Sequence, residues 1–358
     1  MVLKQQIFSD LEKYCHHNCI FATNTSTIDL NIIGQKTASQ DRIVGAHFFS
    51  PAHVMSLLEI VCTHHTSSQV IVDLIDLAKK IQKTPIVVGN CTGFAVNRMF
   101  FPYAQAASFL VDYGLDVYHI DHVITQFGMP MGPFRIHLCV ACLFFEAYVP
   151  VAFDNCLIDS GFRFDNLSYR LADLVGFGVA IATRKQYYQS YPERSYKSML
   201  LQILVEDNRT GESSCKGFYV YDDKRKASRD PDFGKYIEKS RNMAGVMQDP
   251  KLMKLTDNDI VEMIFFPVVN EACRVLDEGI ALKASDLDVA SIMGMGFPSY
   301  RGGVMFWADS LGAKYVYDKL DAWSKDYGEF FRPCEYLAVR ARQGASLAAK
   351  VDGVKSRL

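Results

Sequence analysis

The first quarter of the chain alternates between helical and strand spacing of its apolar residues. Leu3, Ile7 and Leu11 recur at helical intervals, which predicts an amphipathic helix over residues 3–16. A further helix is predicted over residues 70–81. Short apolar runs predict buried strands over residues 19–23, 43–49, 57–62 and 85–88. Strands alternating with helices indicate an α/β domain whose mostly parallel sheet is covered on both faces. We interpret residues 1–91 as the second half of a Rossmann-like domain.

From Gly93 onward the apolar period becomes helical and mostly stays so. Residues 94–112 predict one long helix with Pro102 early in it, and residues 116–127 predict a second. We place the boundary between the sheet and the helical part near Cys91. The expected fold class is therefore α/β followed by all-α.

The helical part repeats itself. Phe100-Phe101-Pro102 recurs as Phe265-Phe266-Pro267, and Gly128-Met129-Pro130 recurs as Gly296-Phe297-Pro298. Such self-similarity predicts two copies of one helical unit, which we assign to residues 92–225 and 255–345.

The first copy contains an atypical insert at residues 136–170. This segment has no lysine, three cysteines and five phenylalanines, a composition unlike that of the surrounding chain. One interpretation is a lid or docking element. The other, which we favour, is sequence that was not selected for the fold, such as a translated intron, because an unsupported insert would expose apolar surface. Peptide mass spectrometry of the native protein, if it readily found this segment, would exclude the intron.

Composition and charge exclude several classes of protein. The chain has 358 residues, is 49% hydrophobic and carries a formal net charge of -2, so charge implies neither nucleic acid nor anionic lipid as a partner. Its ten cysteines have no regular spacing and fit reduced thiols. Cys139 and Cys142 form a lone pair, which we interpret as buried thiols and not as a metal site. The longest apolar run, residues 136–145, is too short to span a bilayer.

The last three residues are a variant of the Ser-Lys-Leu peroxisomal address. Ser356, Arg357 and Leu358 differ from that signal only by arginine for lysine. An import receptor reads such a signal from an exposed end, so we expect residues 351–355 to be disordered. A frayed polar tail is the alternative interpretation.

A histidine and a glutamate on neighbouring predicted strands are the main candidates for chemistry. His47 ends the run 43–49, near the edge where open parallel sheets bind ligands. Histidine is the usual general base for taking a proton from an alcohol. Glu59 lies inside the next apolar run, where a buried carboxylate needs a partner such as an imidazole N–H. We therefore predict a catalytic dyad of His47 and Glu59.

Ser26 and Asn97 are weaker candidates on their spacing alone. Ser26 lies in a Thr-Asn-Thr-Ser-Thr cluster after the first strand, and most such clusters cap helices. Asn97 begins the predicted long helix, where its side chain could face solvent or the cleft.

Five motifs together resemble the L-3-hydroxyacyl-CoA dehydrogenase family. They are Asn-Thr-Ser-Thr at residues 24–27, His-Phe-Phe-Ser-Pro at 47–51, Glu59, Thr-Gly-Phe-Ala-Val-Asn-Arg at 92–98 and Pro-Met-Gly-Pro-Phe at 130–134. With the duplicated helical unit and the Ser-Arg-Leu end, the chain looks like the C-terminal part of the plant-like multifunctional members that act in peroxisomal fatty acid β-oxidation. The resemblance covers nearly everything except the insert.

The resemblance implies an activity, a cofactor and a role for each candidate. In that family the residue matching His47 removes the proton of the 3-hydroxyl while NAD takes the hydride, and the residue matching Glu59 orients the imidazole. The positions of Ser26 and Asn97 hold oxygen atoms of an acyl-CoA substrate. Lys4, Ser26 and Ser50 match positions near NAD, although many relatives carry asparagine at the position of Ser50.

The larger departure from the family lies upstream. A dinucleotide site needs a glycine-rich turn between a strand and a helix, and the only G-x-G patterns, at residues 176–178 and 294–296, follow no predicted strand. We therefore expect the nucleotide-binding half to be missing. One hypothesis is part of an NAD-dependent 3-hydroxyacyl-CoA dehydrogenase that retains its catalytic dyad. The other is a catalytically weak isoform or helical assembly module that binds NAD poorly.

Overall fold

The computed structural model of the chain describes residues 2–26, 28–49, 52–134, 181, 184–211, 214–224 and 226–349, and the backbone of residues 151–153. Ser50, the cysteines at 139 and 142, the C-terminal tripeptide and all but 151–153 of the insert lie outside these residues. The predictions made for them stay predictions.

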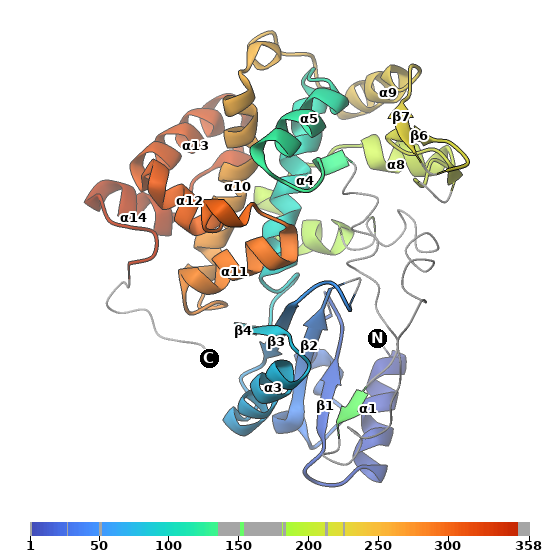
Figure 1. Cartoon of the computed structure of the whole chain (residues 1–358), viewed down its shortest axis with the longest axis vertical. Coiled ribbons are helices and arrows are strands. Elements are labelled where there is room, and N and C mark those ends of the chain that lie inside the picture. Colours follow the sequence, from blue (N-terminus) through green and yellow to red (C-terminus); the bar gives the residue numbers. More distant parts are fainter. Residues whose placement is uncertain are drawn as a thin grey trace.

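A five-stranded sheet forms the lower half of the molecule in Figure 1. In chain order its elements are α1 Val2–Tyr14, β1 Ile20–Thr23, α2 Leu30–Gly34, the 3-10 turn Gln40–Arg42, β2 Ile43–Phe48, β3 Leu57–Cys62, α3 Ser68–Lys80, β4 Thr84–Gly89 and, from within the insert, β5 Val151–Phe153. The strand order is β4-β3-β2-β1-β5. The predicted helices and strands are all present, with boundaries that shift by one or two residues.

The sheet is mixed and not mostly parallel as predicted. The β1–β2 and β3–β4 pairs are parallel, whereas β2–β3 and β1–β5 are antiparallel. Only residues 49–56 join β2 to β3, whereas a parallel pair needs a crossover of about a dozen residues. The short connection therefore reverses the strand, and it places the end of β2 beside the start of β3.

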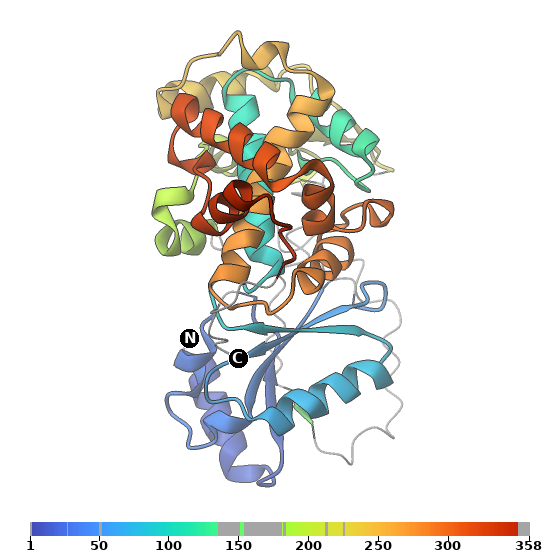
Figure 2. The ribbon, with the colours of Figure 1, turned by 90° about the vertical axis from the view of Figure 1, so that its left-hand side faces the viewer.

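Each face of the sheet has its own apolar core. Val70 and Leu74 of α3 pack with Val44 and Ile60 on one face. Phe8 of α1 packs on the other, in a core that continues without a break into the helical part. Figure 2 shows α3 and α1 on opposite sides of the strands. The prediction that both faces are covered is confirmed.

Helices make up the upper half of the molecule (Figure 1). They are α4 Val96–Asp112, α5 Val117–Phe127, α8 Leu200–Glu206, α9 Gly234–Ala244, α10 Asp257–Asp277, α11 Ala284–Met295, α12 Val304–Leu311, α13 Ala313–Tyr327 and α14 Glu335–Gln343. Residues 184–190 are also helical, and short 3-10 turns occupy Pro192–Arg194, Leu252–Lys254, Ser299–Arg301 and Glu329–Phe331. The predicted order of α/β followed by helices is confirmed. A two-stranded hairpin, β6 Tyr219–Tyr221 and β7 Ala227–Arg229, is the exception that the sequence pattern missed.

The two copies of the repeat face each other in space. The helices α4 and α10 pack together, and the ring of Tyr103 lies 5.4 Å from that of Phe265. The loops that follow the second helix of each copy meet reciprocally. A Cβ added to Gly128 would lie 2.9 Å from Pro298, and one added to Gly296 would lie 2.9 Å from Pro130. Such reciprocal contacts are those of a local two-fold axis between equivalent units.

None of the helices in the described ranges combines the length and the apolar surface that a membrane span requires.

Candidate active site

His47 and Glu59 are direct neighbours across two antiparallel strands. In the register of β2 and β3 their Cα atoms are paired, so both side chains leave the same face of the sheet. His47 Nδ1 lies 2.6 Å from Glu59 Oε2, and the two side chains are 1% and 0% exposed. The contact that the sequence predicted is therefore present. A carboxylate facing Nδ1 makes that nitrogen the donor and leaves the lone pair on Nε2.

The second oxygen of Glu59 is bound by the start of α4. Glu59 Oε1 accepts hydrogen bonds from the backbone N–H groups of Ala95 and Val96, at 3.1 and 3.0 Å. These are among the N–H groups that have no partner within the helix, and they carry the positive end of its dipole. The helix N-terminus thus stabilises the negative charge of Glu59 inside the protein.

The other ring nitrogen of His47 has no hydrogen-bond partner among the residues that the structure describes. The imidazole packs against two aromatic rings, with ring centroids 4.5 Å from Phe49 and 5.6 Å from Phe94. Its Nε2 atom is buried and makes no hydrogen bond to any of the residues described. A buried polar atom without a partner is costly, so it marks a place where a ligand atom is expected. A base with a free lone pair in such a place can take a proton from a substrate hydroxyl.

Asn97 is buried one residue beyond the amides that hold Glu59. It is the second residue of α4 and only 1% exposed. Its Nδ2 atom is buried without a hydrogen-bond partner in the described part of the chain. The sequence left open whether the Asn97 side chain faces solvent or the cleft. The structure places it away from solvent, with an N–H donor that no described residue binds.

Ser26 is buried at the end of β1, but it does not cap the following helix. Asp29 caps α2 by accepting from the backbone N–H of Asn31. Within the cluster, Thr25 Oγ1 accepts from Ile28 N at 3.1 Å, and Asn24 Oδ1 accepts from Phe48 N at 3.0 Å. Ser26 itself is 3% exposed. Ser26 follows the end of β1, and His47 lies near the end of β2. Because β1 and β2 are parallel neighbours, both residues lie toward the same edge of the sheet.

Lys4 and Ser50 are the two remaining candidates for contacts with a cofactor. Lys4 is 7% exposed in the first turn of α1, and its neighbour Gln5 donates to Ile32 O at 2.7 Å. Ser50 lies outside the described residues. Their predicted places beside a nicotinamide cofactor remain predictions.

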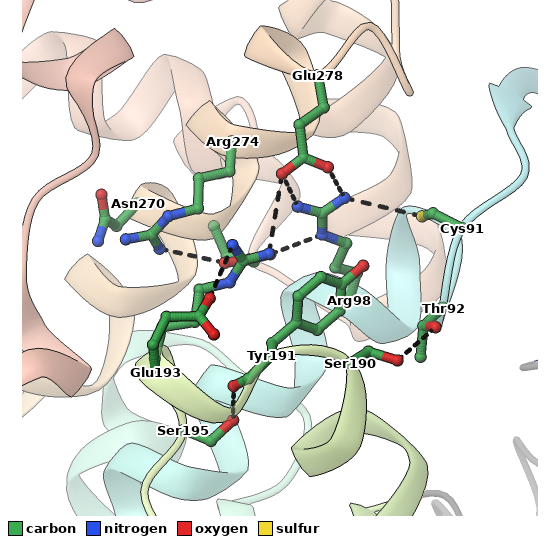
Figure 3. A network of polar contacts seen from close by, with 12 residues as sticks. Cys91, Thr92, Arg98, Ser190, Tyr191, Glu193, Ser195, Asn270, Arg274 and Glu278 are labelled. Atoms are coloured by element: carbon green, nitrogen blue, oxygen red, sulfur yellow. Dashed lines mark hydrogen bonds and ion pairs between the residues drawn. The ribbon is translucent and has the colours of Figure 1, made fainter.

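The sequence did not predict a buried ion-pair network that surrounds Arg98 (Figure 3). Arg98, 0% exposed, contacts Glu271 and Glu278, two carboxylates of the second helical copy. Burial alone would lower the pKa of Arg98, but these carboxylates raise it well above its usual value. Burial alone would likewise raise the pKa of Glu271, but three arginines, Arg98 first, lower it. In the sequence, this network is indicated only by an arginine next to Asn97. That arginine lies at a position of α4 that is buried in the core.

The family follows from comparison with known sequences. Residues 1–91 match the family model described as 3-hydroxyacyl-CoA dehydrogenase, NAD binding domain. Residues 93–145, 157–221 and 260–355 match the one described as 3-hydroxyacyl-CoA dehydrogenase, C-terminal domain. The chain belongs to the 3-hydroxyacyl-CoA dehydrogenase family. The match skips residues 146–156 of the insert and the connection 222–259.

Relatives within the 3-hydroxyacyl-CoA dehydrogenase family are longer proteins. The chain is 62% identical to the peroxisomal fatty acid beta-oxidation multifunctional protein MFP2 of Arabidopsis thaliana, over 99% of this chain and 44% of that protein. It is 33% identical to the peroxisomal bifunctional enzyme of Homo sapiens, over 96% of this chain and 44% of that enzyme. The chain thus spans less than half the length of these relatives.

Two solved structures share the fold of this chain. The dehydrogenase part of multifunctional enzyme 1 from C. elegans matches with a TM-score of 0.61 and 28% identity, over 94% of this chain and 68% of that one. The 3-hydroxybutyryl-CoA dehydrogenase of Escherichia coli matches with a TM-score of 0.70 and 22% identity, over 96% and 79%.

Proposed function

We propose that this chain carries the proton-transfer site of an NAD-dependent 3-hydroxyacyl-CoA dehydrogenase, which oxidises L-3-hydroxyacyl-CoA to 3-ketoacyl-CoA in peroxisomal fatty acid β-oxidation. The observation that carries the proposal is the buried His47–Glu59 pair, 2.6 Å apart, in which His47 Nε2 is bound by none of the described residues. The family models and the names of the relatives support the substrate class.

In this reaction the chain's own residues handle the proton. His47 Nε2 accepts the proton of the 3-hydroxyl as the C3–O bond becomes a carbonyl. Glu59 keeps the Nδ1–H in place and offsets the positive charge that the imidazole gains, without taking the proton itself. The amides of Ala95 and Val96 hold Glu59 as an acceptor throughout. The chemistry that NAD supplies when bound is acceptance of the hydride from C3.

Ser26 and Asn97 are proposed to hold the substrate. The Nδ2 donor of Asn97, which no described residue binds, suits a carbonyl oxygen of an acyl-CoA, since burial makes a donor without a partner costly until a ligand binds. The hydroxyl of Ser26, at the end of the strand beside β2, suits the 3-oxygen. Both assignments rest on the family resemblance together with burial.

The residues described do not provide a pyrophosphate site for NAD. A pyrophosphate is bound by a glycine-rich turn that opens a helix after a strand. The G-x-G at residues 294–296 instead ends α11, with Gly296 as its left-handed C-cap at φ 77°. The second pattern, at 176–178, lies outside the described residues. Lys4 and Ser50 are proposed contacts on the nicotinamide side of the cofactor.

A second candidate follows from this mismatch. The chain could bind NAD weakly and act as a helical assembly module of a larger protein. An NADH titration by fluorescence separates the two: micromolar binding removes the second candidate. Production of NADH from L-3-hydroxybutyryl-CoA then tests the first. Absence of turnover at saturating NAD contradicts the enzymatic proposal for this chain.

We also propose a peroxisomal location, with an import receptor binding Ser356, Arg357 and Leu358. The support is the C-terminal sequence and the peroxisomal and glyoxysomal names of the relatives. A fluorescent protein fused upstream should enter peroxisomes, and deletion of Leu358 should leave it in the cytosol. Import without the tripeptide would contradict this proposal.

A further inference from the structure

The backbone amides that bind Glu59 follow a turn of unusual conformation at residues 91–95. Two successive residues before α4 are left-handed, Gly93 at φ 82° and Phe94 at φ 50°. Glycine adopts this conformation freely, whereas a residue with a side chain does so at an energetic cost. Phe94 is 0% exposed and packs against the His47 ring. Such a conformation persists only if the surrounding residues hold it. The contacts that fix this turn therefore also direct the Ala95 and Val96 amides toward Glu59.

Arg98 and Cys91 close the turn from both ends. The backbone N–H of Arg98 donates to Gly93 O at 3.1 Å. Burial raises the pKa of the Cys91 thiol to about 11, so it stays protonated and can donate to Phe94 O, at 3.3 Å. The guanidinium of Arg98 contacts the same sulfur, with Nη1 3.8 Å from Cys91 Sγ. Both backbone and side chain of Arg98 therefore touch the turn.

The guanidinium of Arg98 is in turn fixed by the second helical copy (Figure 3). Its Nε donates to Glu271 Oε1, and its two terminal nitrogens donate to the two oxygens of Glu278, all at 2.6 Å. Glu271 lies on α10 and Glu278 is the C-cap of that helix. A bidentate guanidinium–carboxylate pair fixes direction as well as distance. Because both Arg98 and Glu271 are buried, this geometry cannot relax into solvent.

We propose that Arg98 is a positioning residue: through the 91–95 turn it fixes the Ala95 and Val96 amides on Glu59, and thereby the imidazole of His47, from an anchor on the second helical copy. The chain of contacts runs from Glu271 and Glu278 to Arg98, to the turn and on to the dyad. The inference deepens the proposed function and rests on it, because it assigns a use to the same His47–Glu59 pair.

Stability alone is a weaker explanation of this network. Removing the charges from water offsets much of the attraction between buried ions, so buried ion pairs are poor evidence of stabilisation and better evidence of fixed geometry. The chain offers a matched control. Arg209 Nη2 and Asp230 Oδ2 form another buried pair at 2.5 Å, between the segment that follows α8 and the residue that follows β7, and it has no described contact with the turn.

The test follows the His47 Nδ1–H proton by NMR in the full chain labelled with 15N-histidine. His47→Gln assigns the resonance, which a short bond to a carboxylate places far downfield. In Arg98→Lys, which keeps the charge but cannot form the fork, we expect the resonance to shift and its exchange with water to speed up by about 10-fold or more. The control variant Asp230→Asn should leave both the position of the resonance and its exchange rate with water unchanged. An unchanged resonance in folded Arg98→Lys would overturn the proposal.

A second variant guards against misfolding. Glu278 is 38% exposed, so Glu278→Gln removes one anchor of Arg98 at little cost in folding, and it should shift the same resonance less. If Arg98→Lys does not fold, an unchanged resonance in Glu278→Gln overturns the proposal. Where turnover is measurable, we expect Arg98→Lys to lower kcat by about 10-fold with KM nearly constant. If His47→Gln leaves turnover unchanged while Arg98→Lys moves the resonance, the proposed function fails and the positioning role stands.

Discussion

The two copies of the helical unit begin in opposite ways. The helix α10 caps itself: Thr256 and Asp259 form a reciprocal capping box, in which Asp259 N donates to Thr256 Oγ1 and Thr256 N donates to Asp259 Oδ2, both at 3.2 Å. The equivalent helix α4 has Ala95 at its N-cap, which makes no side-chain cap. Its first N–H groups bind Glu59 of β3 instead.

Under the proposed function, this difference assigns one unit to the chemistry and its copy to the structure. A helix that supplies its own cap has no amides left for another group. By leaving its N-terminus uncapped, α4 binds a carboxylate from the sheet and so joins the helical part to the His47–Glu59 pair. The copy in α10 supplies the anchor, through Glu271 and Glu278. Where Asn97 lies in α4, α10 carries Glu262, whose carboxylate is paired with Lys319 and Tyr315.

The largest effect is expected at the carboxylate that α4 holds. In Glu59→Gln an amide replaces the acceptor of the Nδ1–H, so the imidazole loses its orientation and charge partner. We expect turnover to fall by about 100- to 10,000-fold. Glu262→Gln, the buried carboxylate of the copy, should leave turnover within about twofold. Steady-state kinetics of both variants tests the comparison, and equal losses would erase the difference between the two helices.

A further effect, on the stability of the protein, is expected where the two helices are joined. Glu271→Gln leaves three arginines without their shared carboxylate, and we expect a loss of roughly 3–5 kcal/mol in the free energy of unfolding. The pKa of Glu271 is lowered from its ordinary 4.5 in the folded protein. Its contribution is therefore fully present above that value and is lost as the pH falls through the folded pKa.

Urea unfolding at several pH values measures both consequences. The wild type should lose stability as the pH drops below about 4.5, and Glu271→Gln should lose less over the same interval. If the free energy of unfolding fell equally with pH in the two proteins, the network would not hold Glu271 ionised.

The smallest effect is expected at the cap of α10. Thr256→Ala removes the acceptor for the Asp259 N–H, at an exposed helix end, and should cost about 1 kcal/mol of stability. Turnover should not change, because no contact of this cap reaches the dyad. Urea unfolding and kinetics on one sample provide the check; a drop in turnover would mean that the copy's N-terminus also acts on the site.

Much of the fold was predictable because it follows from short-range apolar patterns. The strands around His47 and Glu59, the long helix α4 and the repeat of Phe-Phe-Pro were all readable from local spacing. The direction of β3 was also within reach, since the short 49–56 connection excludes a parallel crossover. The β6–β7 hairpin was not, because its three-residue strands have too short an alternating pattern to stand out.

The site was predictable only where its partners are close in sequence or typical of a family. His47 and Glu59 are twelve residues apart on neighbouring runs, and a buried acid calls for a partner. The contact between Arg98 and Glu271 spans 173 residues, and nothing in either local pattern points to the other. The left-handed Phe94 is likewise invisible in sequence, since its conformation is imposed by tertiary contacts.

The most direct measurement compares His47→Gln with His119→Gln under turnover at saturating NAD. His119 is 47% exposed on α5, and among the described residues its ring pairs with the exposed Asp257, so it controls for loss of a histidine as such. We predict that His47→Gln lowers kcat by about 100- to 10,000-fold while NADH binding stays nearly intact, and that His119→Gln changes neither. Wild-type turnover in His47→Gln would make His47 a structural residue and contradict the account.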